Sequence, residues 1–341
     1  MTRSSLLSRL VLCAAIGFAG GAATAAVPSP HAIELPKWFT ESFLDFREDI
    51  ADAKGQGKRL MLYFGQDGCP YCQALMKTHF GDPAIAAATQ RRFVAVALNI
   101  WGDREVTWLD GKKMSEKQLA ALLRVQFTPT LLFLDESGRT ALRVNGYWPP
   151  DRFKLALDYA GGPNAGRLSF ADHIAGRAPP EPLGKLMAES FFATGQADLA
   201  ALVRKRGKPL LAVFEQKSCR ECEELHRDAL QHAEVRARLA KFTAVQIDIF
   251  GEEKLVTPAG THTTAKDWSR DLQVVHAPSL VFFDGAGKEV FRVEGILRAF
   301  HVESALDYVA SGAYRREPSF QRFIRARADR LRASGRAVVL W

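Results

Sequence analysis

Short runs of consecutive apolar residues alternate along this chain with segments whose apolar positions recur every three or four residues. Residues 60–64 (LMLYF) and 210–214 (LLAVF) are such runs, and they are typical of strands buried on both faces of a sheet. Each run is followed, after a few residues, by a helical pattern at 71–80 or 221–230. The pattern therefore predicts a strand followed by a helix in two separate parts of the chain.

The same order of elements continues after each of these helices. The predicted elements are a second strand (93–100 and 242–249), a hairpin-like insertion (108–113 and 256–264), a helix (115–126 and 265–274), a proline, a strand ending in an Asp-x-x-Gly turn, and a last strand and helix. Alternation of this kind predicts an α/β fold with a central mixed sheet and helices on both faces.

The two series of elements share sequence as well as order. GKRLMLYF (57–64) matches GKPLLAVF (207–214), and FTPTLLFLDESGR (127–139) matches HAPSLVFFDGAGK (276–288). A repeat of about 150 residues is too long for a solenoid unit and indicates two copies of one domain. We predict domains at 36–165 and 186–315, a Pro- and Gly-rich linker at 166–185, and an arginine-rich C-terminal helix or tail at 316–341.

The first 25 residues have the composition of a secretory signal peptide. Arg3 and Arg9 precede an apolar run, and Ala23-Thr24-Ala25 provides a small-x-small cleavage site. Cys13 lies inside this segment and is expected to be removed with it. No later apolar stretch is long enough to span a membrane, so the sequence predicts an exported protein, located in the periplasm.

Composition and charge restrict the possible partners only slightly. The chain has 341 residues, 47% of them hydrophobic and 25% charged, as in soluble globular proteins. Its formal net charge of +8 falls by two without the leader, an excess too small to indicate nucleic-acid binding. The basic segment 322–336 fits either a solvated helix face or a docking patch for an acidic partner.

The four remaining cysteines form two C-x-x-C pairs, Cys69–Cys72 and Cys219–Cys222. A disulfide between such close positions closes almost no loop and stabilises little, so the pairs indicate reactivity or metal binding. A four-cysteine zinc site would require the pairs of two equivalent domains to converge. Covalent haem is disfavoured because neither motif continues with histidine. We therefore expect no metal site.

The position of the first pair favours redox chemistry. Cys69 would lie at the start of a helix, where free N–H groups and the helix dipole lower a thiol pKa. Pro70 suits the first helical position, because its missing N–H has no partner there anyway. Cys72 would lie one turn further, shielded. Cys69 would attack a substrate disulfide, and Cys72 would resolve the mixed disulfide that forms.

The order strand, C-x-x-C, helix, and later Thr128-Pro129 opening a strand, resembles the thioredoxin superfamily. The CPYC sequence is similar to glutaredoxin sites, and the segments NIWGDREVTWLDGKKMSEKQLA and VQFTPTLLFLDESG look like periplasmic thioredoxin-related proteins of the sulfur-oxidation (SoxW) type. The resemblance implies a tandem pair of thioredoxin folds with cis prolines facing the dithiols. It implies catalytic roles for Cys69, Cys72, Cys219 and Cys222, and substrate contacts for Pro70, Tyr71, Thr128, Pro129, Ala277 and Pro278.

The sequence departs from the thioredoxin pattern in two places. Thioredoxins carry a buried aspartate six residues before the first cysteine, where this chain has Tyr63 and Val213. Proton transfer must therefore differ, through water or through Tyr63. The second motif, CREC, lacks the proline and is surrounded by glutamates, so we expect Cys219 to be a poorer thiolate than Cys69. His276 falls beside Cys219, whereas Trp148 is interpreted as a core or rim residue.

These features predict an exported thiol-disulfide oxidoreductase that acts on protein thiols and disulfides without an organic cofactor. The resemblance implies a role in sulfur oxidation or cytochrome maturation and a membrane thiol donor of electrons. The direction of electron flow, the activity of the second domain and the oligomeric state stay open. The alternative is a binding or scaffold protein with locked disulfides, in which the second domain holds a partner.

Overall fold

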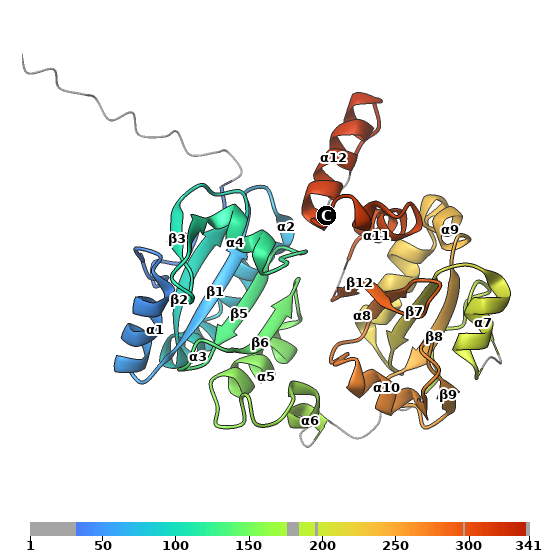
Figure 1. Cartoon of the computed structure of the whole chain (residues 1–341), viewed down its shortest axis with the longest axis horizontal. Coiled ribbons are helices and arrows are strands. Elements are labelled where there is room, and N and C mark those ends of the chain that lie inside the picture. Colours follow the sequence, from blue (N-terminus) through green and yellow to red (C-terminus); the bar gives the residue numbers. More distant parts are fainter. Residues whose placement is uncertain (1–31, 176–183, 195–196, 296, 339–341) are drawn as a thin grey trace, which may run out of the picture.

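The chain folds into two similar α/β units that lie side by side (Figure 1). The computed structural model describes residues 32–175, 184–194, 197–295 and 297–338. The predicted signal peptide, 1–25, and part of the predicted linker lie outside the described residues. Among the described residues, no helix combines the length and the apolar character needed to cross a bilayer.

The first unit contains one main sheet, a short two-stranded ribbon and helices around them. Its elements are α1 (Phe46–Gly55), β1 (Arg59–Gly65), α2 (Pro70–Ala74), the π-helix η1 (Leu75–His79), α3 (Pro83–Arg92), β2 (Phe93–Asn99), β3 (Glu105–Thr107), β4 (Lys113–Ser115), α4 (Glu116–Leu122), β5 (Thr130–Leu134), β6 (Thr140–Asn145) and α5 (Pro150–Ala160).

The second unit repeats this order. Its elements are α7 (Leu199–Arg206), β7 (Leu210–Glu215), α8 (Arg220–Glu224), the π-helix η2 (Leu225–Leu230), α9 (Ala233–Leu239), β8 (Thr243–Asp248), β9 (Lys254–Val256), β10 (His262–Thr264), α10 (Ala265–Asp271), β11 (Ser279–Phe283), β12 (Glu289–Glu294) and α11 (Ala299–Ala310). The predicted α/β class and the tandem repeat are confirmed.

Each main sheet is mixed, with strand order β2-β1-β5-β6 in the first unit and β8-β7-β11-β12 in the second. The central strand β1 runs parallel to β2 and antiparallel to β5, so that Leu62 lies beside Val96 on one side and Leu132 on the other. The edge strands β6 and β12 lie on the sides of the units that face one another (Figure 1).

The uninterrupted apolar runs are explained by burial on both sheet faces. Alternate side chains of a strand point to opposite faces. Met61 and Tyr63 of β1 belong to the cluster under α2, α3 and α5, whereas Leu62 and Phe64 belong to the cluster under α1 and α4. Each fully buried side chain of this size contributes about 1.5–3 kcal/mol. Both faces of the central strand therefore need apolar residues.

The helix predicted over 115–126 is shorter in the structure. It begins with a capping box at Ser115 and ends at Leu122, and Arg124 takes a left-handed backbone conformation with φ 51°. That turn ends the helix, because residues with a Cβ enter this region only at a cost. Val125 and Gln126 are thereby released to form the loop that leads to Pro129. The apolar residues keep a helical spacing beyond Leu122, so the sequence pattern did not show that the helix ends there.

The linker and the C-terminal segment are partly helical. In the predicted linker, α6 (Phe170–Ala175) packs on the first unit, where Phe170 stacks on Trp148 with ring centroids 5.9 Å apart. After the short 3-10 helix η3 (Ala313–Arg315), α12 (Phe320–Ala333) projects upward at the top centre of the view, beside the second unit (Figure 1). Most arginines of α12 are exposed, but Arg327 is buried and bonds to Glu303 and Asp307 at 2.6 Å each.

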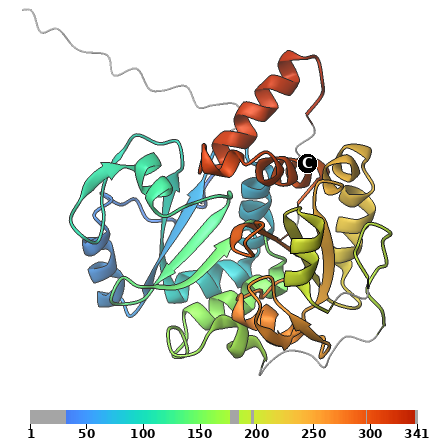
Figure 2. The same cartoon turned by 45° about the vertical axis from the view of Figure 1, so that its right-hand side comes forward.

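The two units meet through equivalent loops, those that follow β6 and β12 (Figures 1 and 2). Asn145 donates a hydrogen bond to Glu294 at 3.2 Å, and these two residues occupy equivalent positions in the repeat. A Cβ placed on Gly295 would lie 2.8 Å from the Tyr147 carbonyl oxygen, and one on Gly146 would lie 3.1 Å from the Glu294 carbonyl oxygen. The units are therefore packed face to face about an approximate two-fold axis.

Candidate active site at the interface of the two units

Cys69 occupies the N-cap of α2, between the end of β1 and the first helical turn. The backbone N–H of Cys72 points at the Cys69 Sγ, with 3.1 Å between nitrogen and sulfur, and Pro70 takes the first helical position. A negative charge on Sγ would be stabilised by this N–H and by the helix dipole. The predicted position of Cys69 at a helix start is confirmed.

The second unit repeats this geometry with different neighbours. Cys219 is the N-cap of α8, and the Cys222 N–H lies 3.1 Å from its Sγ. Glu221 and Glu223 place negative charge in the first helical turn. This charge interacts favourably with the helix dipole, but it would repel a thiolate at Cys219. Arg220 is exposed and pairs with Glu224 rather than with the sulfur. The lower reactivity expected of Cys219 stays a prediction.

Each pair of cysteines is joined as a disulfide within its own unit, Cys69 to Cys72 and Cys219 to Cys222. Among the described residues, no three His, Cys, Asp or Glu side chains gather as metal ligands. The four sulfurs thus form two separate two-electron couples. A dithiol that becomes a disulfide gives up two electrons without another group, so these pairs could carry redox chemistry by themselves.

The Thr128-Pro129 and Ala277-Pro278 peptide bonds are both cis, as the resemblance implied. The Thr128 carbonyl oxygen lies 3.4 Å from the Cys69 Sγ, and the Ala277 carbonyl oxygen lies 3.9 Å from the Cys219 Sγ. Each loop therefore presents backbone directly beside the first sulfur of its pair. Their contact with substrate stays a prediction.

Both first cysteines are buried in the structure. The exposed fraction is 5% for Cys69, 6% for Cys219 and 0% for Cys72, although only Cys72 was expected to be shielded. The apolar cluster that contains Cys69 also contains Val275 and packs against Leu297, both from the second unit. Local sequence could not reveal this cover, because it comes from residues about 200 positions away.

Tyr71 contacts the second unit, and its predicted contact with substrate stays a prediction. Its hydroxyl accepts a hydrogen bond from the Arg298 N–H at 3.0 Å, and its ring meets the His301 ring edge-on at 5.3 Å. Burial raises the Tyr71 pKa to about 12, so the hydroxyl stays protonated at neutral pH. Pro70, next to Tyr71, is half-buried at the same rim.

The residue before each cis-proline segment also contacts the opposite unit. His276 stacks on Trp148 with ring centroids 5.9 Å apart, and Phe127, its equivalent, stacks on Phe291 at 5.7 Å. Burial, with Arg152 nearby, lowers the His276 pKa to about 3, so the ring is neutral at neutral pH. Trp148, predicted to be a core or rim residue, is a core residue that is 2% exposed, and it also contacts His276 of the second unit.

Tyr63 takes the place of the thioredoxin aspartate and is 3% exposed. Its hydroxyl has no hydrogen-bond partner among the described residues, and burial raises its pKa. It therefore cannot act as a base near neutral pH. A cavity of about 430 Å³, lined also by Gln66 and Asp67, adjoins Tyr63.

A buried acid–histidine cluster in the second unit was not predicted. His226, four residues after Cys222, is fully buried and contacts Glu215 at 2.9 Å and Glu189 at 3.2 Å. Burial alone would lower the His226 pKa, but the two carboxylates raise it above 6.5. The sequence contained one sign of this cluster, because Glu215 is an acidic residue at the end of an apolar strand. The spacing of residues along the chain does not show which side chain a single histidine contacts.

His226 should make the stability of the second unit depend on pH. Because its pKa is higher in the folded than in the unfolded state, it stabilises fully below pH 6.5 and loses this contribution as the pH rises through the folded value. We expect His226→Gln to remove the part of the unfolding free energy that is lost as the pH rises above 6.5. Urea unfolding at pH values below and above 6.5 measures it, with the exposed His262→Gln as the control. Equal slopes in all three proteins would contradict the assignment.

Comparison with known proteins places this geometry among described folds. A family model described as a thioredoxin-like domain matches residues 46–161 and 197–310, together more than half of the chain. Both dithiols and both cis prolines fall within the matched segments. No curated protein matches the sequence.

Several solved structures are similar to parts of the chain. They include a thioredoxin-fold protein from Helicobacter pylori (27% identity, 35% of this chain and 79% of that one, TM-score 0.31) and a thioredoxin from Thermus thermophilus (27%, 36% and 89%, TM-score 0.29). The C-terminal domain of DsbD from Neisseria meningitidis, in its oxidised form, is 18% identical over 34% of this chain and 97% of that one, with a TM-score of 0.25. The family assignment itself depends on the family model, which covers both units.

Proposed function

This chain belongs to the thioredoxin-like domain family, with two such domains in tandem, and from that premise we propose that it is an exported thiol-disulfide oxidoreductase. Its substrates would be disulfides of other exported proteins. The observation that supports this most directly is Cys69 at a helix N-cap, with the Cys72 N–H 3.1 Å from its sulfur and the Thr128 carbonyl oxygen 3.4 Å away. This arrangement both activates a thiolate and offers backbone to an extended substrate.

The reaction follows from the positions of the two sulfurs. In the reduced protein, the Cys69 thiolate attacks one sulfur of a substrate disulfide, and the other substrate sulfur leaves as a thiolate that takes up a proton. Cys72 then loses its proton and attacks the Cys69 sulfur. The Cys69–Cys72 disulfide forms, and the second substrate sulfur is released as a thiol. Two electrons and two protons pass from the protein to the substrate.

Access to Cys69 requires the two units to separate. A protein disulfide cannot approach a sulfur that is 5% exposed and belongs to an apolar cluster shared with Val275 of the second unit. We infer that the face-to-face arrangement is a resting state and that the reactive state is an open one. The open state needs only a small population, because a minor conformer in rapid exchange can carry the whole reaction.

Export and the electron donor complete the proposal. The leader-like segment 1–25 supports passage to the periplasm. Reduction of substrates in that oxidising compartment would require a membrane-embedded thiol donor, and the resemblance to sulfur-oxidation proteins supports such a partner. The second pair, Cys219–Cys222, would act as a further dithiol of lower reactivity.

A second candidate function draws on the burial of both dithiols. Sulfurs that never leave the interface would make the chain a tandem binding protein with locked disulfides. Its capture of a partner would then be non-covalent and independent of Cys69.

A trapping experiment separates the two functions. In a protein whose second pair is replaced by serine, Cys72→Ala is compared with Cys69→Ala after incubation of the reduced proteins with insulin. We expect a covalent adduct on non-reducing gels, with the summed mass, for Cys72→Ala alone. Equal non-covalent capture by both variants, without adduct, would reject the oxidoreductase in favour of the binding protein. The reciprocal variants of Cys219 and Cys222 test the second pair.

A further inference from the structure

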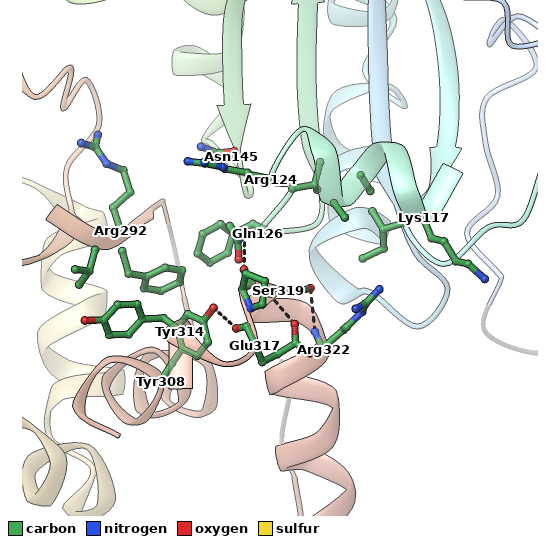
Figure 3. Close-up of a pocket in the computed structure, with 18 of the residues that line it drawn as sticks. Lys117, Arg124, Gln126, Asn145, Arg292, Tyr308, Tyr314, Glu317, Ser319 and Arg322 are labelled. Carbon is green, nitrogen blue, oxygen red and sulfur yellow. Dashed lines mark hydrogen bonds between the residues drawn. The ribbon is translucent and has the colours of Figure 1, made fainter. Parts of the chain in front are cut away.

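A cavity of about 600 Å³ lies between the two units, outside the dithiol sites (Figure 3). Its walls come from α4 and β6 of the first unit and from β12, α11 and the start of α12 of the second. Gln126 crosses it, since its side chain accepts a hydrogen bond from the Phe320 N–H at 2.8 Å and donates one to the Pro318 carbonyl oxygen at 2.9 Å. The cavity has the size of a typical ligand site.

The charged side chains around this cavity are mainly basic. Its lining contains five cations, Lys117, Arg124, Arg143, Arg292 and Arg322, but only two carboxylates, Glu289 and Glu317.

The two carboxylates and two of the arginines already have partners. Glu289 is held by Arg292 with two bonds of 2.6 Å, and Glu317 accepts the Ser319 N–H at 2.9 Å. Arg143 donates to the carbonyl oxygens of Leu123 and Arg124, the two residues that follow α4. Lys117 pairs with Asp103 at 2.5 Å.

Two cations are left without a partner. The guanidinium groups of Arg124 and Arg322 have no ion pair and no hydrogen bond in the described part of the chain. Figure 3 shows them on either side of Gln126, which crosses the cavity. An elongated ligand with separate negative charges would pair with both by extending past Gln126.

The backbone of β12 supplies a second feature that suits an elongated ligand. Four consecutive residues of this strand, 289–292, line the cavity. β12 pairs only with β11 among the described strands, so its outer edge is free. A free strand edge can pair with an extended peptide through main-chain hydrogen bonds.

We propose that this cavity is a docking site for an extended acidic segment of a partner protein. The segment adds to the free edge of β12, and its carboxylates pair with Arg124 on the first unit and Arg322 on α12. Docking uses neither dithiol, so the proposal does not depend on the redox function.

Peptide binding to the oxidised full-length protein tests the proposal. The probe is a fluorescein-labelled peptide of about eight residues that alternates glutamate and valine, so that its charges lie on one side of an extended chain. We expect saturable binding that weakens as salt is added, because the paired charges are screened. The same peptide with glutamine in place of glutamate should bind at least about tenfold more weakly.

Matched variants locate the site. Arg124→Glu/Arg322→Glu should weaken binding of the glutamate peptide by at least about tenfold, while Arg91→Glu/Arg330→Glu, with the same change of net charge on exposed helix positions, should leave it nearly unchanged. Circular dichroism checks that both variants are folded. Equal losses in the two variants would show that only net charge matters and would overturn the proposal.

A backbone-modified peptide tests the role of the strand edge. N-methylation of alternate peptide nitrogens keeps the carboxylates but removes the main-chain donors, so it should abolish most of the binding. If the methylated peptide bound equally well, or if citrate displaced the unmodified peptide completely, the cavity would be a site for anions in general and the docking of an extended segment would be disproved.

Discussion

Replacement of Gly295 by alanine is expected to increase the rate at which reduced Cys69 is alkylated by roughly tenfold or more. The new Cβ would lie 2.8 Å from the backbone oxygen of Tyr147 in the opposite unit, a distance that real Cβ atoms essentially never show. Overpacking against a backbone costs about 1–3 kcal/mol, and this cost exists only while the units are closed. Each 1.4 kcal/mol changes an equilibrium population by a factor of about ten, so the population of the open state should rise by about that factor.

The backbone strain of the same substitution does not favour opening. Gly295 has φ +95°, and the cost for alanine in this backbone conformation belongs to the loop itself, separate from the contact with Tyr147. Gly260→Ala is the matched control, because Gly260 has φ +91° and nothing within 4 Å of its added Cβ. Iodoacetamide labelling of the reduced proteins, followed by mass spectrometry of the Cys69 peptide, measures the rates. If Gly295→Ala reacted no faster than Gly260→Ala, reagents would reach Cys69 without separation of the units.

Replacement of Phe320 by alanine is expected to lower the free energy of unfolding by about 3–5 kcal/mol. This side chain is fully buried at the start of α12. Its ring centroid lies 4.7 Å from that of Phe291 and 5.5 Å from that of Phe127, a residue of the first unit. The substitution therefore leaves a cavity at the point where α12 meets both units. The core of the second unit and the interface between the units both lose contacts.

Phe323→Ala provides the control on the same helix. Phe323 is half-buried and contacts Tyr308 within the second unit, so its loss should cost about 1 kcal/mol. Urea unfolding followed by tryptophan fluorescence, with separate analysis of the two transitions if the units unfold independently, measures both variants. Similar costs for the two phenylalanines would mean that α12 does not link the units through Phe320.

The fold of each unit could be predicted because its signals are local. The apolar run 60–64 marks a strand whose observed bounds are Arg59–Gly65, and the run 210–214 marks Leu210–Glu215. A strand that is buried on both faces of a sheet needs apolar residues at consecutive positions, and these runs therefore favour such a strand. The hairpin-like insertion at 108–113 was also confirmed, as the ribbon of β3 and β4. By contrast, the helix expected over 115–126 ends at Leu122, since a left-handed turn leaves no trace in hydrophobic spacing.

Of the candidate site, only the positions of the two cysteines at the start of the helix could be predicted from the sequence. The order of Cys69, Pro70 and Cys72 at a strand–helix junction requires an N-cap sulfur with a second sulfur one turn on, and the structure has both. The partners of Tyr71 and Trp148 were not predictable, because each contacts a residue that is more than 100 positions away. His226 likewise needed the folded chain to bring Glu215 and Glu189 to it.

The sequence by itself determined two copies of one α/β domain, each with a dithiol at a helix start, because these features depend on residues close together in the chain. The cis proline beside each dithiol was implied by the resemblance to thioredoxins. Only the tertiary structure decided that the copies face one another, that both first sulfurs are covered, and that a basic cavity lies between the units. Such features depend on which surfaces meet. The periodicity of side chains along one strand or helix carries no information about a partner surface far along the chain.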